Sequence, residues 1–221
     1  MSKNLICKND IVDSIKNYTP NQIKLFYGML YKFKESVTFQ GVEKDEDINM
    51  DLSEIKQLLK DSNLSQKRIQ EIVYNMPIEI KRIDNQSTSR VCVFEKISYS
   101  FEEEALIFKV TGDFANIFLE ILKHYTIIQL ECITKLNSKY SQRLYELSKR
   151  YLKQENYLMK IEDFKLYFQV PPSYQMGNVD QVILNPAIKE LNKKTNIKCS
   201  IEKKKKGRKL THILFKFKKE V

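Results

Sequence analysis

A basic run near the end of the chain, KKKKGRK at residues 203–209, carries the clearest chemical signal in the sequence. Six of its seven residues are Lys or Arg, and the other is Gly207. Residues 198–221 hold ten Lys and Arg against two Glu, so most of the net charge of +10 is concentrated there. Positive charge gathered in one place attracts polyanions, and nucleic acid is the first candidate partner. A basic tail kept for solubility is the alternative that composition leaves open.

The segments on both sides of this run favour a hairpin over a tail. IKCSIE before it and THILFKFK after it alternate apolar and polar residues in the manner of strands. Because Ile213, Phe215 and Phe217 need a core to pack on, we interpret the basic run as the turn between two strands. Gly207 would supply the unusual backbone angles of that turn.

A polar pattern lies on the helix predicted just before this hairpin, in NVDQVILNPAIKELNKKT. Gln181, Asn185 and Lys189 follow each other at four-residue spacing and share one face. Asn and Gln amides pair with the adenine edge in the major groove, and Lys suits guanine or phosphate. A plain solvated helix face is the alternative. Asn178 is the predicted N-cap, and Pro186 should bend the helix or begin a new segment.

The order of predicted elements is that of a winged helix, in which three helices precede a set of strands. The first half has helical patterns and then strand patterns, and the second half repeats this order. The predicted helices cover 18–34, 51–61, 62–76, 138–153, 161–170 and 178–195, and the predicted strands cover 79–83, 90–101, 104–111, 197–202 and 211–218.

The two halves also align weakly in sequence. MDLSEIKQLL from Met50 matches MKIEDFKLYF from Met159 in its apolar and acidic positions. We therefore predict an α+β chain of two tandem winged-helix domains related by a weak internal repeat. Their expected bounds are 1–115 for an N-terminal domain and 116–221 for a C-terminal domain, which is the main DNA-binding domain.

Motifs for catalysis, metal binding and membrane insertion do not occur. The sequence has no phosphate-binding GxxxxGK[ST] loop and no His-x-His pair. His124 and His212 have no neighbours at ligand spacing, and the four Cys are far apart, as in a protein with reduced thiols. No signal peptide or apolar run of membrane-spanning length is visible. We expect a cytoplasmic protein that is not an enzyme and has no cofactor, no metal and no membrane contact.

Two segments resemble a known family. LNSKYSQRLYEL at 136–147 is similar to the SKYS-x-RLYEL segment of plasmid replication initiators, the iteron-binding Rep proteins of theta-type plasmids. Residues 185–217 resemble the final helix and wing of the same family. The resemblance implies tandem winged helices that bind double-stranded DNA at origin direct repeats and start replication with host replication proteins. It also implies a homodimer through the N-terminal domain that binds an operator inverted repeat and represses its own gene.

The candidate DNA contacts come from both halves. The family's GR turn implies phosphate contacts for Arg208 and the lysines beside it, and its RLYE motif implies either a phosphate contact or a Glu146 pair for Arg143. Many relatives have Arg or Lys where this chain has Asp180, Gln181 and Val182, so base reading shifts to Gln181, Asn185 and Lys189 and favours an A·T-rich site. The full set is Gln66, Lys67, Arg68, Gln70, Lys139, Arg143, Asn178, Gln181, Asn185, Lys189, Lys203, Lys204, Lys205, Lys206, Arg208 and Lys209.

Three other functions stay open at this stage. A winged-helix transcriptional regulator without a replication role has the same fold and chemistry, and differs only in the layout of its DNA sites. A nuclease or nicking enzyme needs a metal or a tyrosine beside His. An RNA-binding module also fits a basic hairpin.

Overall fold

The computed structural model describes residues 4–7, 15–39, 46–77, 79–83, 88–115, 126–207 and 209–220. The chain divides into two compact units, Met1–Thr134 and Lys135–Val221. This division falls later in the chain than the expected boundary between 115 and 116. The reason is that β7 (Thr126–Gln129) pairs with β1 (Asn4–Cys7), which ties this later segment to the first unit.

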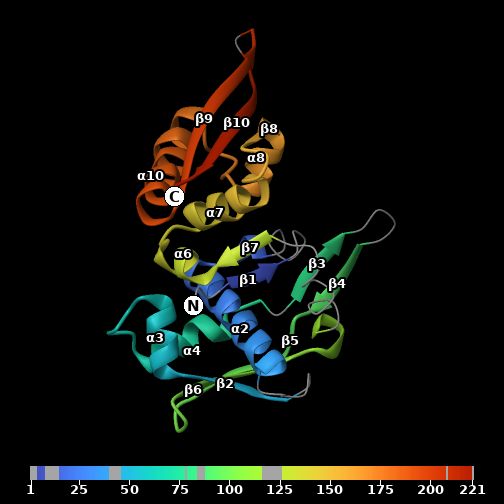
Figure 1. Ribbon diagram of the computed structural model, residues 1–221, viewed down its shortest axis with the longest axis vertical. Coiled ribbons are helices and arrows are strands. Elements are labelled where there is room, and N and C mark those ends of the chain that lie inside the picture. The colour runs from blue at the N-terminus through green and yellow to red at the C-terminus, as the bar shows by residue number, and fades with distance from the viewer. Residues whose placement is uncertain are drawn as a thin grey trace. The chain divides into compact units, whose positions relative to one another are not determined.

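The first unit contains the predicted three helices and then strands (Figure 1). The long helix α2 begins at Pro20, and Thr19 and Gln22 cap its start through reciprocal hydrogen bonds, as the Thr-Pro pair predicts. Besides β1 and β7, the first unit contains η1 (Ile15–Asn17), α2 (Pro20–Phe39), β2 (Ile48–Asp51), α3 (Leu52–Leu59), α4 (Gln66–Tyr74), β3 (Glu79–Ile83), β4 (Thr88–Cys92), β5 (Phe94–Ser100), β6 (Ala105–Val110) and α6 (Leu130–Lys135).

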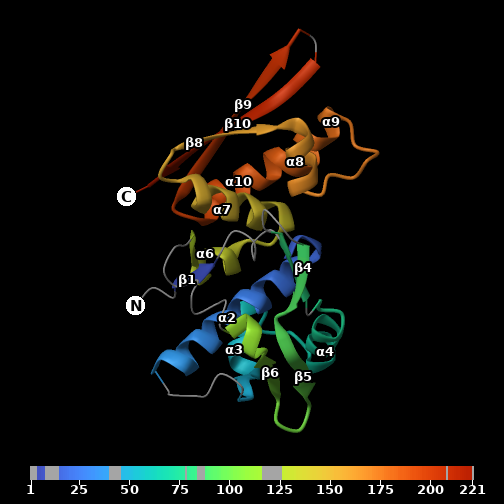
Figure 2. The same cartoon turned by 90° about the vertical axis from the view of Figure 1, so that its right-hand side faces the viewer.

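The second unit has the same plan. Its elements are α7 (Lys139–Tyr151), β8 (Asn156–Lys160), α8 (Ile161–Tyr167), α9 (Met176–Asn178), η2 (Val179–Leu184), α10 (Asn185–Lys194), β9 (Ile197–Lys206) and β10 (Lys209–Lys219). The helices α7, α8 and α10 lie on one side of the sheet (Figure 2). Inward-facing Ile213, Phe215 and Phe217 are buried in this core, as their alternation predicts.

The internal repeat is visible in the strand order of the two units. The sheet of the first unit has the order β2-β6-β5, and that of the second has β8-β10-β9, so the first strand pairs with the last in both. The weak alignment is in register, because Leu52 and Ile161 are the first residues of the matching helices α3 and α8. The first unit differs by the added hairpin of β3 and β4.

Candidate nucleic-acid interface

Helix 176–194, formed by α9, η2 and α10 without a break, is the third helix of the second unit. Val179, Ile183, Ala187 and Leu191 are buried at four-residue spacing. In a regular α-helix each four-residue step would turn the apolar stripe by roughly 40° beyond a full turn. The π-helical segment η2 has more residues per turn, and this keeps the stripe on the core.

The start of this helix differs from the prediction. Asn178 has helical backbone angles (φ −66°, ψ −40°) and its side chain makes no capping hydrogen bond, so its expected role as an N-cap is wrong. The helix already begins at Met176. Pro186 is in the first turn of α10, which begins one residue earlier, so the predicted new segment starts here while the helix itself continues. Its missing N–H falls where the hydrogen-bonding pattern changes from π to α.

The outer face of helix 176–194 has the predicted polar composition. Gln181, Asn185 and Lys189 are all exposed. Val182, beside Gln181, is also exposed, with 48% of its surface accessible. Asn178 is exposed one turn earlier. The helix therefore presents amides, the ammonium groups of Lys189 and Lys193 and the apolar side chain of Val182 to the solvent.

Asn192 ties this helix to the sheet. Its amide Nδ2 donates to the carbonyl of Cys199 at 3.0 Å, and its Oδ1 accepts from the Cys199 N–H at 2.7 Å. Both hydrogen bonds go to the backbone of β9, so the base of the hairpin is fixed to the C-terminal end of the helix. Sequence analysis alone did not separate Asn192 from its exposed polar neighbours.

The basic hairpin, formed by β9 and β10, extends beyond the helices of its unit (Figure 1). Lys206 pairs with Lys209 across the hairpin, and Gly207 directly follows Lys206 as a turn residue. Gly207 has φ +62°, as predicted for a residue in a left-handed turn conformation. A register shift near Thr211, whose hydroxyl donates to the Lys204 carbonyl, changes the pairing below the tip.

Carboxylates engage the lower lysines of this hairpin. Lys203 lies on the face that carries Ile213 and forms an ion pair with Asp180 of the helix. On the opposite face, Glu202 pairs with Lys204 and with Lys216. Hydrogen bonds from Lys216 and Lys204 lower the pKa of Glu202 to about 2. These pairs hold the strands together and offset part of the positive charge.

The charge at the tip is not offset in this way. Lys205, Lys206 and Lys209 are exposed, and among the residues that the structure describes no carboxylate lies within ion-pair distance of them. Arg208 lies outside the described residues. The tip therefore concentrates the cations that are available to phosphates.

Glu190 links helix 176–194 to the start of α7. Its carboxylate accepts from the backbone N–H groups of Asn137 at 3.0 Å and Ser138 at 3.3 Å, and from Lys194 Nζ at 2.6 Å. Partial burial acts to raise the pKa of Glu190, but these hydrogen bonds outweigh it and the pKa is lowered. The ionised carboxylate thus positions the outer helix against α7.

Helix α7 contributes little exposed charge. Arg143 is 3% exposed and pairs with Glu146 at 3.0 Å, the second of its two anticipated roles. Lys139, at the first position of α7, lies over the ring of Tyr140 with its Nζ 5.1 Å from the ring centre. Leu144 and Tyr145 are fully buried and Tyr140 is half-buried, so these side chains belong to the packing of the unit.

The matching surface of the first unit combines a few basic residues with an acidic turn. Lys67 and Gln70 on α4 are exposed, while Arg68 pairs with Glu71 at 2.7 Å. Gln66 donates to Glu104 at 2.5 Å. Glu104 belongs to the turn of the β5–β6 hairpin, whose exposed residues Glu102, Glu103 and Glu104 occupy the place of the basic tip in the second unit. The acidic run FEEE can be read from the sequence, but only the structure shows that it occupies the position equivalent to the basic hairpin tip.

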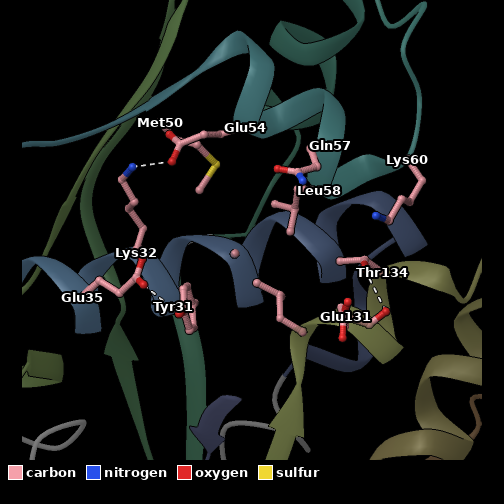
Figure 3. Close-up of a pocket in the computed structure, with 12 residues that line it drawn as sticks. Tyr31, Lys32, Glu35, Met50, Glu54, Gln57, Leu58, Lys60, Glu131 and Thr134 are labelled. Atoms are coloured by element: carbon pink, nitrogen blue, oxygen red, sulfur yellow. Dashed lines mark hydrogen bonds and ion pairs between the residues drawn. The ribbon is translucent and has the colours of Figure 1, made fainter. Parts of the chain in front are cut away.

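A separate hollow of about 220 Å³ lies in the first unit between α2, α3 and α6 (Figure 3). Its polar groups are largely paired, since Lys32 bonds Glu54 at 2.5 Å and Tyr31 donates to Glu35 at 2.7 Å. Gly28 and Leu58 meet at its floor. Over the described parts of the chain no cluster of His, Cys, Asp and Glu could hold a metal ion, and no helix is long and apolar enough to cross a membrane.

The repeated helix–turn–helix, with a hairpin beside the third helix, defines a tandem winged-helix protein of the DNA-binding class. Two family models match the chain, "Initiator Replication protein, WH1" over residues 5–149 and "Initiator Rep protein, WH2" over residues 160–217. The chain belongs to the family of initiator Rep proteins, and its function is replication initiation. A regulator with no replication role is not favoured.

Two solved structures share this fold. One is described as "Crystal structure of Pi initiator protein in complex with iteron DNA"; it has a TM-score of 0.77 and 17% sequence identity, and covers 98% of this chain and 97% of that chain. The other contains domains 2 and 3 of RctB, with a TM-score of 0.54 and 10% identity, and covers 90% of this chain and 82% of that chain.

Proposed function

We propose that this initiator binds directly repeated sites, or iterons, at a plasmid origin through the second unit. The observation that carries the proposal is the exposed row Gln181, Asn185 and Lys189 on a helix beside a hairpin. The lysines at the tip of this hairpin have no carboxylate partner among the described residues. Amides on such a helix suit adenine edges in the major groove, and lysines on the tip suit the phosphates beside it. The initiator Pi, similar in fold, is described in complex with iteron DNA.

The contacts of the proposed interface fall into two classes. Gln181, Asn185 and Lys189 read bases, and Asn178 lies at the edge of the same surface. Phosphate contacts come from the hairpin tip, with Lys203 and Lys204 contributing less because carboxylates hold them. The tip cations are Lys205, Lys206, Arg208 and Lys209. Lys139 is a further phosphate candidate, whereas we leave Arg143 out because of its Glu146 pair.

The first unit supplies a weaker contact. The exposed residues Lys67 and Gln70 at the start of α4 carry it, with Gln66 and Arg68 held in local pairs. The acidic turn next to them repels phosphates, so this unit adds less affinity than the second. We also propose that the same unit joins two copies into a homodimer that binds an operator inverted repeat, and that host replication proteins act with the bound initiator. We expect DNA binding and replication initiation to take place in the cytoplasm, where the DNA lies.

Selection of bound duplexes from random DNA at about 150 mM salt tests the proposal, because nonspecific phosphate contacts are weak there. We expect one motif of about 20 base pairs, long enough for two major-groove contacts one turn apart. It should occur as tandem direct copies near the gene. A lone palindrome would instead favour a regulator, and the absence of any motif would contradict sequence-specific binding.

A set of wing variants tests the phosphate class separately. Changing Lys205, Lys206 and Lys209 together to Gln should weaken specific and nonspecific DNA about equally and reduce the salt slope by up to about 3. The matched control changes Lys153, Lys218 and Lys219, which are exposed away from the tip, to Gln. A loss confined to one DNA sequence would contradict a phosphate role.

A further inference from the structure

Val182 is an exposed apolar residue that the core of the second unit does not explain. Its neighbours Val179, Ile183 and Leu184 are almost fully buried and already anchor this part of helix 176–194 to the sheet. Val182 points away from them, with 48% of its surface accessible. β-Branched residues are also unfavourable in helices, so neither packing nor helix formation accounts for a valine here.

The backbone around Val182 is held in a defined shape. The N–H of Asn185 reaches back five residues to the carbonyl of Asp180, which is the hydrogen bond of the π-helical segment. Pro186 follows directly and fixes the next turn. Val182 and Gln181 are therefore adjacent exposed residues on a constrained segment, at the N-terminal end of the proposed base-reading row.

The charge next to Val182 is neutralised. Asp180 pairs with Lys203 of the hairpin, so its carboxylate is engaged by a cation of the same unit. Between Asp180 and Asn185 the exposed side chains are then one amide and one isopropyl group. A surface of this composition suits a base pair that offers both a hydrogen-bonding edge and an apolar group.

We propose that Val182 contacts the 5-methyl group of a thymine while Gln181 hydrogen-bonds an adenine in the same step. Thymine is the one base of unmodified DNA that presents a methyl group in the major groove, and the adjacent amide pairs with adenine N6 and N7. Val182 is thus a specificity-determining residue. The inference rests on the proposed DNA binding of helix 176–194.

Replacing single thymines of the selected site by deoxyuridine tests this contact, because the change removes only the methyl group. We expect one position at which deoxyuridine weakens binding of the unaltered protein about fourfold, the effect of burying one methyl-sized group. Val182→Ala should bind the site with thymine about as weakly as the unaltered protein binds the site with deoxyuridine. The variant should no longer distinguish thymine from deoxyuridine at that position. Thermal unfolding of Val182→Ala should match that of the unaltered protein, since the side chain is exposed.

The matched control is Leu158→Ala, which removes an apolar side chain of similar exposure, 52%, from the sheet face opposite the helices. It should keep the full response to deoxyuridine. A selected site at which no thymine responds, or a Val182→Ala protein that responds as strongly as the unaltered one, would overturn the inference and leave iteron binding standing. Failure to select any site would overturn both.

Discussion

Asp180 of helix 176–194 and Lys203 of the basic hairpin form an ion pair that joins the two parts of the proposed DNA-binding surface. Both side chains are about 30% exposed, so the pair contributes little to stability. Its effect lies in the placement of charge. One carboxylate sits within a surface that faces phosphates, and one hairpin lysine is held on the core-side face of the sheet instead of at the tip.

Asp180→Asn should strengthen binding to all DNA, because it removes a repulsive charge and releases Lys203 toward phosphate. We expect the salt slope to steepen by about 1 and the ratio of specific to nonspecific affinity to fall. Titration of specific and nonspecific duplexes at several salt concentrations measures both. Glu155→Gln, an equal change of charge at an exposed turn far from the hairpin tip, is the control. Weaker binding by Asp180→Asn would mean that Asp180 itself accepts a hydrogen bond from a base.

Glu190→Gln should destabilise the second unit at neutral pH by roughly 1.5–3 kcal/mol, the contribution of hydrogen bonds to a charged group. The pKa of Glu190 is lowered in the folded chain, so its stabilisation is present above the ordinary pKa of 4.5 and is lost as the pH falls through the lowered value. The difference between the two proteins should therefore shrink below about pH 4.5. Urea unfolding from pH 7 to 3 checks this, and a difference that stays constant with pH would exclude the carboxylate as the cause.

Gly207→Val should disrupt the hairpin tip, because a β-branched residue at φ +62° is strained by about 1–2 kcal/mol. We expect weaker DNA binding together with a lower free energy of unfolding, while Gly207→Asn should retain most of both. Gly112→Val is the matched control, since Gly112 has open space around it and no positive φ. Equal behaviour of the Val and Asn variants would contradict a conformational role for Gly207.

Changing Glu102, Glu103 and Glu104 together to Gln tests the secondary contact of the first unit. If this unit lies on DNA, removal of the acidic turn should raise affinity and steepen the salt slope at about 50 mM salt, where surface charges are least screened. Glu104→Gln keeps an amide oxygen that can accept the hydrogen bond from Gln66, so the change removes charge and leaves that bond possible. Unchanged affinity and slope would place the turn away from the DNA and restrict binding to the second unit.

Gly28→Ala should destabilise the first unit, because an added Cβ would lie 2.3 Å from a terminal methyl of Leu58 across the α2–α3 contact. Overpacking of this kind costs about 1–3 kcal/mol, against a gain of about 1 kcal/mol in helix propensity. In a double-mutant cycle with Leu58→Ala, the combined loss should be smaller than the sum of the single losses. Stabilisation by Gly28→Ala alone would show that Leu58 moves aside freely.

The sequence by itself determined the helices, the hairpin and the residues that could read DNA. The spacing of buried residues, the cap at Thr19 and the positive φ of Gly207 are local properties, so pattern and turn chemistry predict them. The internal repeat also followed, because matching helices carry matching apolar positions.

Only the tertiary structure decided which of these residues are available. Asp180 meets Lys203 and Asn192 meets Cys199 because the hairpin folds back over the helix. Glu190 meets the start of α7 because the helix packs against α7. A single sequence does not indicate such pairings. The expected N-cap at Asn178 is wrong because the helix already begins at Met176, and Asn178 therefore has helical backbone angles. The boundary between the units likewise depends on the pairing of β1 with β7, two strands at opposite ends of the first unit.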